Sequence, residues 1–506
     1  MTLDAKNTGS TTALKYNAVQ NKNRRQKPRT KPTSEFVQLG KTDRKTLIAT
    51  TQDQMRNVAM VPWMVRHHLD YVSRFKVQFN NDNEDLVKLL NTLFRWHASP
   101  QNFDIAGRYG REEMFRMFEL EKVTAGDAGI NKLSCMKLQA IESDMIAKPN
   151  GRKLSRNGNA KTMPKNVREN VNEEGVILSN IYAGKVDYYC VCNRGNDGKS
   201  ILYDHLEKAQ NIIFGAYWSR FGSQIRGVSP LSTAINTVQD LYENFEWTLL
   251  KTKIHAIFGV AIMRDYYGSD SQDEESTALG DAADPSTTTE DPVGDIETSL
   301  QDLNPDQMLL LDMGVKGKVD TIESKTPSTE FLAFSELMLR IAFMALDIPY
   351  TAFNSAQSSF SGLIADTNLY EVSCQHKRDK NMWARKDYSD WLLDMCYKSD
   401  RFGIRSFCDK NAVSIDEVKE SVEWVSSGIP WLQKLQEVAG DANAIAIGAD
   451  NIVDVCKRRG KDFYQNIDKQ AKALAYAKEN NVSIMIGDPG QLSVEQIEKD
   501  EDAQDE

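Results

Sequence analysis

RGVSPLSTAINTVQDLYENFEWTLLKTKIHAIFGVAIMRD, residues 226–265, predicts one long helix that ends in a short strand. Ser229 is the expected N-cap and Pro230 the first helical residue, because both residue types are favoured at those positions. Apolar residues then follow one helical face at Leu231, Ile235, Val238, Leu241, Phe245 and Leu249. The helix should run to about Phe258, a length of roughly 40 Å. Gly259 ends it, and a strand-like run begins at Val260.

A second helix is expected at residues 330–346 (EFLAFSELMLRIAFMAL), where one stripe carries Phe331, Phe334, Met338, Ile341 and Ala345. A strand-like segment, 307–323, and an acidic low-complexity insertion, 268–306, lie between the two helices. A helix out, a small β element and a helix back would form a projecting stalk. Two ordinary core helices of a large domain are the alternative, and periodicity alone favours that alternative.

The rest of the chain is expected to be mainly helical with some β structure, an α+β class. Helical patterns occupy residues 44–68 (broken near Pro62), 85–95, 111–123, 364–398, 443–448, 452–459 and 462–480. Residues 176–181 and 186–192 are expected to form a hairpin, followed by a strand at 211–217. The basic start of the chain, 1–45, and the acidic end, 487–506, have too few apolar residues for a packed core.

Composition limits the class of protein. With 506 residues the chain can form two or more domains with sizeable cores. No apolar run reaches the length of a membrane span, and the N-terminus has no secretory signal, so no membrane association is expected. Seven scattered cysteines argue for reduced thiols rather than a disulfide framework. The net charge of −10 argues against a protein that grips DNA tightly and fits a conduit better.

The sequence contains no recognisable catalytic or metal-binding pattern. A phosphate-binding GxxxxGK[ST] loop, GxSxG, HExxH and zinc-ligand spacings are all missing from it. His67 and His68 are neighbours in a predicted helix and should face different ways. The acidic insertion lacks the ligand spacing of a calcium loop. We therefore predict no catalytic residue, no metal and no cofactor, and no ATP hydrolysis by the chain itself.

Five short segments carry a resemblance to a known family. They are Trp218 with RFGSQIRGVSPL (220–231), FDIAGR (103–108), LQAIESDMI (138–146), DIPYTAF (347–353) and RRGKDF (458–463). In this order they resemble the portal proteins of tailed double-stranded DNA phages, in the lambda-like branch, over roughly residues 50–485. Each segment is weak alone, and five in family order are fairly specific. The resemblance implies a phage portal fold with wing, stem, clip and crown regions, assembled as a ring. It also implies a passive channel, and only together with the resemblance does the missing site chemistry predict that the chain is not an enzyme.

The resemblance also implies a division of the chain. It comprises a flexible basic N-terminal arm (1–45), a wing (46–228), a stem helix (229–258), a clip (259–328) with the disordered acidic insertion (268–306), a return stem helix (329–347), a tunnel loop and tunnel helix (348–398), a wing return (399–440), crown helices (441–486) and a disordered acidic tail (487–506). The resemblance favours the stalk over two ordinary core helices, and the stalk would then be the stem. Its two helices would stand beside those of neighbouring copies around an axial channel.

Candidate site residues follow from this picture. Those expected near the channel or near DNA are Lys251, Lys253, Gln357, Ser358, Ser359, Phe360, Ser361, Lys377 and Arg378. An ordinary connecting loop remains the alternative for residues 354–362. The basic cluster of the tunnel helix could face the channel or solvent; it comprises Lys377, Arg378, Lys380, Arg385 and Lys386. Candidates for subunit contacts are Leu241, Phe245, Trp247, Phe258 and Phe343, because a stem helix must meet both its return helix and a neighbouring copy.

The implied function is a portal ring of twelve copies at one capsid vertex of the virion, assembled in the bacterial host cytoplasm. The implied partners are other copies of the chain, double-stranded DNA bound without sequence preference, the terminase large subunit, the major capsid protein or scaffold, and a head–tail adaptor. Two alternatives stay open: a nucleic-acid-processing enzyme with an unrecognised site, and another virion structural protein such as a capsid or tail-adaptor component. A ring with a through-channel would discriminate against both.

Overall fold

The computed structural model describes residues 39–81, 83–149, 152–153, 161–162, 169–182, 184–195, 201–222, 224–257, 260–265, 310–315, 317–320, 329–354, 359–426 and 434–480. The chain divides into two compact units. Unit 1 contains the residues up to Asn236 and from Arg340 onward, and unit 2 is Thr237–Leu339. Most of the predicted N-terminal arm, the acidic insertion and the acidic tail lie outside the described residues, so those predictions stay untested.

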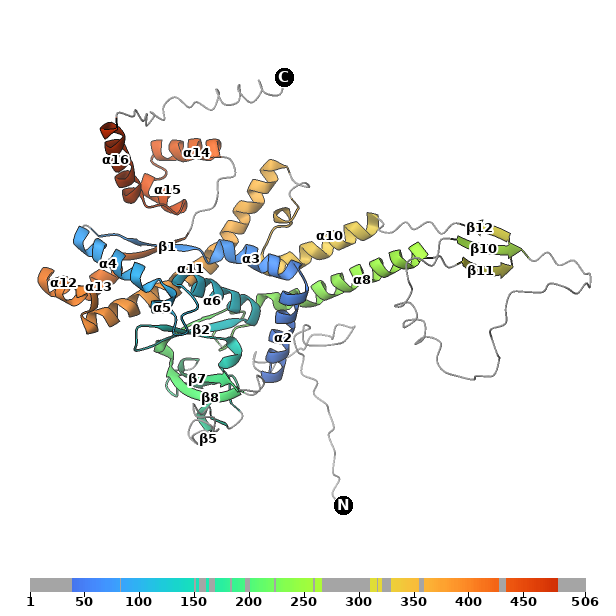
Figure 1. The fold of residues 1–506 in the computed structure, drawn as a ribbon, viewed down its shortest axis with the longest axis horizontal. Helices are drawn as coiled ribbons and strands as arrows, with labels where there is room; N and C mark the ends of the chain where they lie inside the picture. The colour runs from blue at the N-terminus through green and yellow to red at the C-terminus, as the bar shows by residue number, and fades with distance from the viewer. Residues whose placement is uncertain are drawn as a thin grey trace, which may run out of the picture. The chain divides into compact units, whose positions relative to one another are not determined.

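Unit 1 is mainly helical, as the sequence predicted (Figure 1). Its helices are α2 (Lys41–Asn57), α3 (Met60–Val72), α4 (Glu84–His97), α5 (Pro100–Phe103), α6 (Arg111–Ala125), α11 (Phe360–Ser399), α12 (Ile404–Asn411), α13 (Ile415–Glu420), α14 (Lys434–Ala446), α15 (Ile452–Arg458) and α16 (Phe463–Glu479). Its strands are β1 (Phe75–Phe79), β2 (Asp127–Lys132), β3 (Leu138–Ile141), β4 (Arg152–Lys153), β5 (Lys161–Thr162), β6 (Val176–Leu178), β7 (Val186–Arg194), β8 (Ile201–Lys208), β9 (Ile212–Ala216) and β13 (Val422–Ser426).

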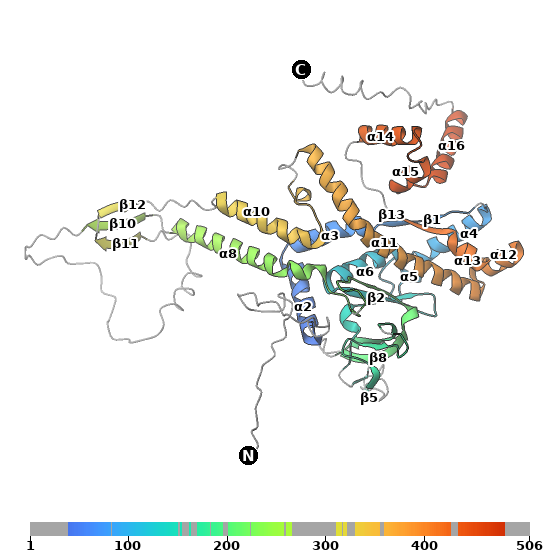
Figure 2. The ribbon, with the colours of Figure 1, turned by 180° about the vertical axis from the view of Figure 1, so that it is seen from behind.

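The strands form small sheets rather than one large sheet. β1 pairs with β13, β2 lies between β3 and β9, and a five-stranded sheet has the order β5-β4-β8-β7-β6. The predicted hairpin is confirmed as the antiparallel pair of β6 and β7. The predicted last strand is β9. Figure 2, which shows the chain from behind, places β8 and β5 at one end of unit 1.

The main core of unit 1 forms around the C-terminal half of α11. Tyr388, Leu392 and Leu393 are fully buried there against α4, α6 and the β2–β3 pair. His97 of α4 joins these parts, since its Nδ1 lies 2.8 Å from the Tyr388 hydroxyl and its Nε2 lies 2.8 Å from the carbonyl oxygen of Met136. The core therefore joins residues from both ends of the chain.

Helix boundaries follow local chemistry. The predicted helix 44–68 is two helices, α2 and α3, and the break falls at residues 58–59 rather than at Pro62. Pro62 lies in the first turn of α3, where a missing N–H costs nothing. Because α2 already begins at Lys41, the last residues of the predicted flexible arm are helical. Asn83 caps α4 by accepting hydrogen bonds from the N–H groups of Asp85 and Leu86.

Unit 2 contains a pair of helices and a small sheet. The helices are α8 (Ile235–Ile257) and α10 (Thr329–Phe343); the first two residues of α8 and the last four of α10 belong to unit 1. The rings of Phe245 and Phe331 meet edge to face, with centroids 5.9 Å apart. The sheet has β10 (Val260–Asp265) between β11 (Leu310–Val315) and β12 (Gly317–Asp320). The predicted order of a helix, a small β element and a second helix is thus present, and the projecting stalk itself stays a prediction.

The start of the first long helix differs slightly from the prediction. Ser229 does act as a cap, because its hydroxyl accepts a hydrogen bond from the N–H of Leu231. The first turn, η4 (Pro230–Thr233), is however a 3-10 turn, and the α-helix begins at Ile235.

Among the described residues, none of the helices is both long enough and apolar enough to cross a bilayer.

Candidate functional site: the arginine hub and the helical pair

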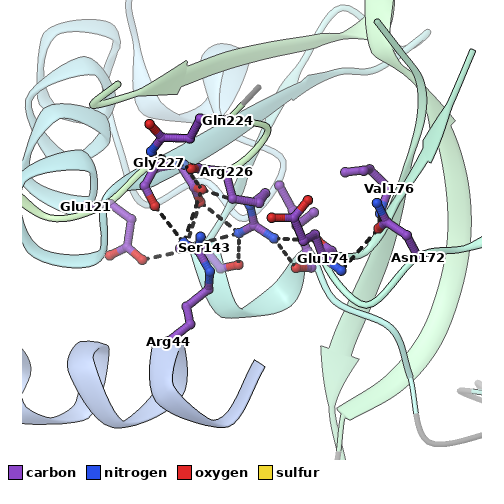
Figure 3. A network of polar contacts seen from close by, with 11 residues as sticks. Arg44, Glu121, Ser143, Asn172, Glu174, Val176, Gln224, Arg226 and Gly227 are labelled. Carbon is purple, nitrogen blue, oxygen red and sulfur yellow. Dashed lines mark hydrogen bonds and ion pairs between the residues drawn. The ribbon is translucent and has the colours of Figure 1, made fainter. Parts of the chain in front are cut away.

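Arg226 lies in the segment that leads into α8, and all of its N–H groups have acceptors (Figure 3). Its Nε and Nη2 donate to the two carboxylate oxygens of Asp127, both at 2.8 Å. Nη2 also donates to the carbonyl oxygen of Ser143 at 2.7 Å. Nη1 donates to the carbonyl oxygens of Ile146 at 2.6 Å and Glu174 at 2.8 Å. We call this group the arginine hub.

The Asp127 carboxylate is the second centre of the hub and is completely buried. Besides Arg226 it accepts hydrogen bonds from the N–H of Gly227 at 2.8 Å and from the hydroxyl of Ser143 at 2.6 Å. The Arg44 guanidinium of α2 lies 3.7 Å from it and donates to the carbonyl oxygen of Gly227 at 2.6 Å. Burial would raise the pKa of Asp127, but these donors, chiefly Arg226, hold it below its usual value. Asp127 is therefore ionised and paired.

Two glycines allow the hub segment to pass close to the end of α6. Gly126 has φ +101°, a conformation that other residues rarely adopt. A Cβ on Gly227 would lie 2.0 Å from the carbonyl oxygen of Gly126, so only glycine fits there. Ser229 then donates to the carbonyl oxygen of Val123 at 2.6 Å. The backbone immediately before η4 is thus fixed from both sides.

Glu121 of α6 lies beside the hub, and its carboxylate accepts a hydrogen bond from the N–H of Ser143 at 3.1 Å. Burial, together with the nearby carboxylates of Glu142, Asp144 and Asp127, raises the pKa of Glu121 from 4.5 to about 7. The folded chain therefore holds a proton on Glu121 that the unfolded chain releases between pH 4.5 and pH 7. Stability from this group is present at low pH and is lost as the pH rises through 7.

Glu121→Gln should therefore stabilise the protein in a pH-dependent way. Relative to the natural protein, its free energy of unfolding should rise by about 2 to 3 kcal/mol between pH 5 and pH 8, since one pKa unit corresponds to about 1.4 kcal/mol. Urea denaturation across this range measures the difference. The exposed Glu113→Gln on the same helix is the control. If the free energies of unfolding of Glu121→Gln and the natural protein differ by the same amount from pH 5 to pH 8, Glu121 does not have a raised pKa.

The second feature is the surface of the helical pair, defined as the unit 2 parts of α8 and α10. Beyond Leu241, none of the described side chains of α8 is buried in one chain, although several are large and apolar. The exposed apolar side chains of the helical pair are Tyr242, Phe245, Trp247, Leu249, Leu250, Leu332, Phe334 and Leu337. Large exposed apolar surfaces in soluble proteins often mark binding sites, so these side chains are candidates for contacts with other chains.

The five candidates for subunit contacts fall into three groups. Trp247 is 63% exposed and Phe245 is 42% exposed, so both are available to a neighbour. Leu241 and Phe343 are buried within the chain and offer no surface, because they already contribute to its packing. Phe258 lies outside the described residues.

Of the residues expected near the channel, four are exposed in the structure and two lie outside the described residues. Lys251 and Lys253 are exposed on α8. Ser359 and Ser361 are exposed at the start of α11, and the Ser359 hydroxyl caps that helix through the N–H of Gly362. Phe360 begins α11. Gln357 and Ser358 lie outside the described residues.

Several side chains of the basic cluster on the predicted tunnel helix are paired or buried within the chain, so they cannot all face a channel or solvent as expected. Lys377 pairs with Asp347 at 2.9 Å, and Arg378 pairs with Glu371. Arg385 is fully buried, with its guanidinium 4.4 Å from the centre of the Phe75 ring and 4.5 Å from that of Phe115. Sequence spacing identified the helix, but tertiary packing decides which cations face outward.

The neighbouring histidines point to different surroundings. His68 is buried, with Nδ1 3.1 Å from the Tyr370 hydroxyl and Nε2 3.4 Å from the Tyr217 hydroxyl. Burial lowers the pKa of His68 well below 6.5, so it is neutral at pH 7. His67 instead stacks on Trp63 at 5.4 Å. In the described part of the chain, no three metal-ligating side chains gather around one point.

Sequence reasoning did not find the arginine hub. Arg226 appeared only as one letter of a motif, and Asp127 was not singled out. Gly227, next to Arg226, is a local sign that two backbone segments approach each other closely here, but it does not show that Arg226 is buried. The partner carboxylate lies 99 positions away, and no spacing rule indicates it.

Comparison with known proteins gives one family and a set of solved structures. The model of the family "Phage portal protein, lambda family" matches residues 22–365. The virion of a native gene transfer agent particle contains a similar chain, with 13% identity and a TM-score of 0.42, covering 84% of this chain and 94% of that one. The neck of that particle, computed with C12 symmetry, gives 12% identity and a TM-score of 0.42, covering 83% and 99%. No curated protein matches the sequence.

Proposed function

We infer the function from one premise: this chain belongs to the lambda family of phage portal proteins, whose model covers more than half of it. We propose that it forms a closed ring of twelve copies at one vertex of a phage capsid and is part of the virion. The ring is the channel for DNA during packaging and ejection. Subunits assemble in the bacterial host cytoplasm.

The exposed apolar surface of the helical pair carries this proposal. A ring subunit needs two different surfaces that meet those of its neighbours, because a cyclic contact joins unlike faces. Trp247 and Leu250 lie on α8, and Leu332 and Leu337 lie on α10, so both helices of the pair offer side chains that one chain leaves open to water. These side chains are 36% to 63% exposed, so burying the remainder of each is worth roughly 1 kcal/mol and favours association.

The chemistry of the chain fits a passive conduit. The net charge of −10 disfavours tight binding to phosphates, and the exposed Lys251 and Lys253 supply only a limited positive charge. DNA would then move without being held. In this proposal the terminase large subunit and later a head–tail adaptor bind at the clip, while the wing meets the major capsid protein or scaffold. The chain itself has no enzymatic role.

Trp247→Asp tests the proposal. Trp247 is exposed in one chain, so the variant should fold with a near-normal melting temperature. A charge buried between copies should block ring formation, and light scattering after size exclusion should show single chains where the natural protein gives rings in negative-stain images.

Thr252→Asp is the matched control, because it adds the same charge at an exposed polar position of α8. It should assemble like the natural protein. If Trp247→Asp forms rings as readily as Thr252→Asp, the helical pair is not the ring interface. If the natural protein forms no rings under any condition, the proposed function itself is wrong.

A further inference from the structure

The two halves of α11 meet the rest of unit 1 in different ways. In the second half, Tyr388, Leu392 and Leu393 lie in the main apolar core. In the first half, from Ser361 to Lys380, the buried side chains among those that the structure describes are Tyr370 and Cys374. A change in the surroundings of these two residues therefore acts mainly on the first half.

His68 of α3 lies against Tyr370 and is fully buried. The Tyr217 hydroxyl donates to a carboxylate oxygen of Glu119 at 2.6 Å, and Glu119 pairs with Lys122. Because the only proton of Tyr217 is used in this way, its oxygen accepts from the Nε2–H of His68, 3.4 Å away. Nδ1 of His68 then carries no proton and accepts a hydrogen bond from the Tyr370 hydroxyl at 3.1 Å. The hydrogen bonds thus fix one neutral form of the imidazole.

Tyr370 is the residue through which α11 meets α3 here. Its ring packs edge to face on Tyr71, with centroids 4.7 Å apart, and stacks on His67 at 5.7 Å. One helical turn further on, the Cys374 thiol makes a hydrogen bond with the Tyr370 side chain and is fully buried. A reagent in solution can therefore reach Cys374 only when the first half of α11 moves away from α3.

A second proton on His68 would disrupt this contact. It would bind at Nδ1, so the Tyr370 hydroxyl could no longer donate there and its hydrogen would be left buried without an acceptor. The imidazolium would also lie near the ammonium groups of Lys122 on α6 and Lys377 on α11, and near His67. Burial, together with these cations, lowers the pKa of His68 well below 6.5.

The direction of the pH effect follows from this arrangement. When the first half of α11 has moved away, His68 contacts water and its pKa returns towards 6.5. Above pH 6.5 the imidazole is neutral in both forms, and the closed form keeps its full stability. Below pH 6.5 the open form binds a proton that the closed form excludes. The ratio of open to closed chains should then rise about tenfold per pH unit, until the pKa of His68 in the closed form is reached.

We propose that His68 is an acid-sensitive latch: a proton on its Nδ1 releases the first half of α11 from α3, while the second half stays in the core. Ser359 and Ser361, at the start of α11, move with the released half. The inference concerns a single chain and does not rest on the proposed function.

The thiols of α11 test the latch, because Cys374 lies in its first half and the fully buried Cys396 in its second. The natural protein is treated with N-ethylmaleimide at pH 7.5 and at pH 5.0, and labelling is measured by peptide mass spectrometry. The exposed Cys135 corrects for the effect of pH on thiol reactivity. Relative to Cys135, labelling of Cys374 should rise at least about tenfold at pH 5.0, and labelling of Cys396 should stay unchanged.

Two variants identify the titrating group. His68→Gln keeps a neutral side chain at every pH, so its Cys374 should be labelled equally at both pH values. His67→Gln changes the half-buried neighbour and should keep the rise. The latch is overturned if Cys374 labelling does not change with pH in the natural protein, if Cys396 labelling rises with it, or if the rise persists in His68→Gln. Should His68→Gln fail to fold, the comparison of Cys374 with Cys396 in the natural protein still decides.

Discussion

Arg226→Met is expected to lower the free energy of unfolding of unit 1 by about 3 to 5 kcal/mol, the usual consequence of leaving a buried charge without its partner. The Asp127 carboxylate would stay buried with only its weaker donors. The carbonyl oxygens of Ser143, Ile146 and Glu174 would each lose a hydrogen bond. The midpoint of urea denaturation, followed by circular dichroism, measures the loss.

Two further variants test whether the loss of stability comes from the unpaired charge of Asp127. Arg108→Met removes a guanidinium from an exposed position and should change stability by less than about 0.5 kcal/mol. Arg226→Met combined with Asp127→Asn should lose less than the sum of the single changes, because the amide carries no charge that needs a partner. If Arg226→Met behaved like Arg108→Met, the arginine hub would have no structural role.

Gly227→Ala should be about as damaging, at roughly 3 kcal/mol or more, because overpacking of this kind usually costs 1 to 3 kcal/mol and here the obstacle is rigid. The added Cβ would lie 2.0 Å from the carbonyl oxygen of Gly126 and 3.0 Å from the Cβ of Ala216. The Gly126 carbonyl oxygen accepts a hydrogen bond from the N–H of Tyr217 at 2.9 Å, and the N–H of Gly227 donates to Asp127 at 2.8 Å, so separating the two segments would break one of these bonds. We expect little soluble protein at 37 °C, and thermal unfolding of what remains should show a large drop in melting temperature.

Gly40→Ala is the appropriate control. Gly40 precedes α2, and a Cβ there would meet only the Asp43 side chain, at 3.7 Å. Its loss should stay below about 1 kcal/mol, the usual effect of a less suitable N-cap residue. A Gly227→Ala protein as stable as Gly40→Ala would mean that the two segments can separate at little cost.

Periodicity predicted much of the secondary structure, because helices and strands leave repeating patterns in the sequence. The apolar spacing from Leu231 to Leu249 predicted most of α8, and the residues around Val176 and Val191 predicted the β6–β7 hairpin. Turn geometry was less predictable. The 3-10 turn before Ile235 and the break at residues 58–59 between α2 and α3 were not predicted, because the apolar spacing of both segments continues across them.

The candidate site was harder to predict than the fold. Both Trp247 and Phe343 were predicted to contact a neighbouring subunit, yet Trp247 is exposed and Phe343 is completely buried within the chain. The same holds for Arg385, which belonged to a cluster expected at a channel or in solvent and instead fills a cage of aromatic rings. Burial is decided by which elements meet, so a side chain's availability cannot be deduced from its position on one helix.

The discontinuous core of unit 1 has a consequence for synthesis. Its first part ends at Ile213, and its second part begins at Tyr388. A ribosome adds about 5 to 20 residues per second, so the first part waits roughly 10 to 40 s for the second. Residues 237–339 emerge during this interval. Each nascent polypeptide therefore exposes the apolar side chains of α8 and α10 before the core of unit 1 can form. Apolar surface exposed on unfinished chains promotes their aggregation, so this interval favours contacts between nascent polypeptides on one messenger RNA.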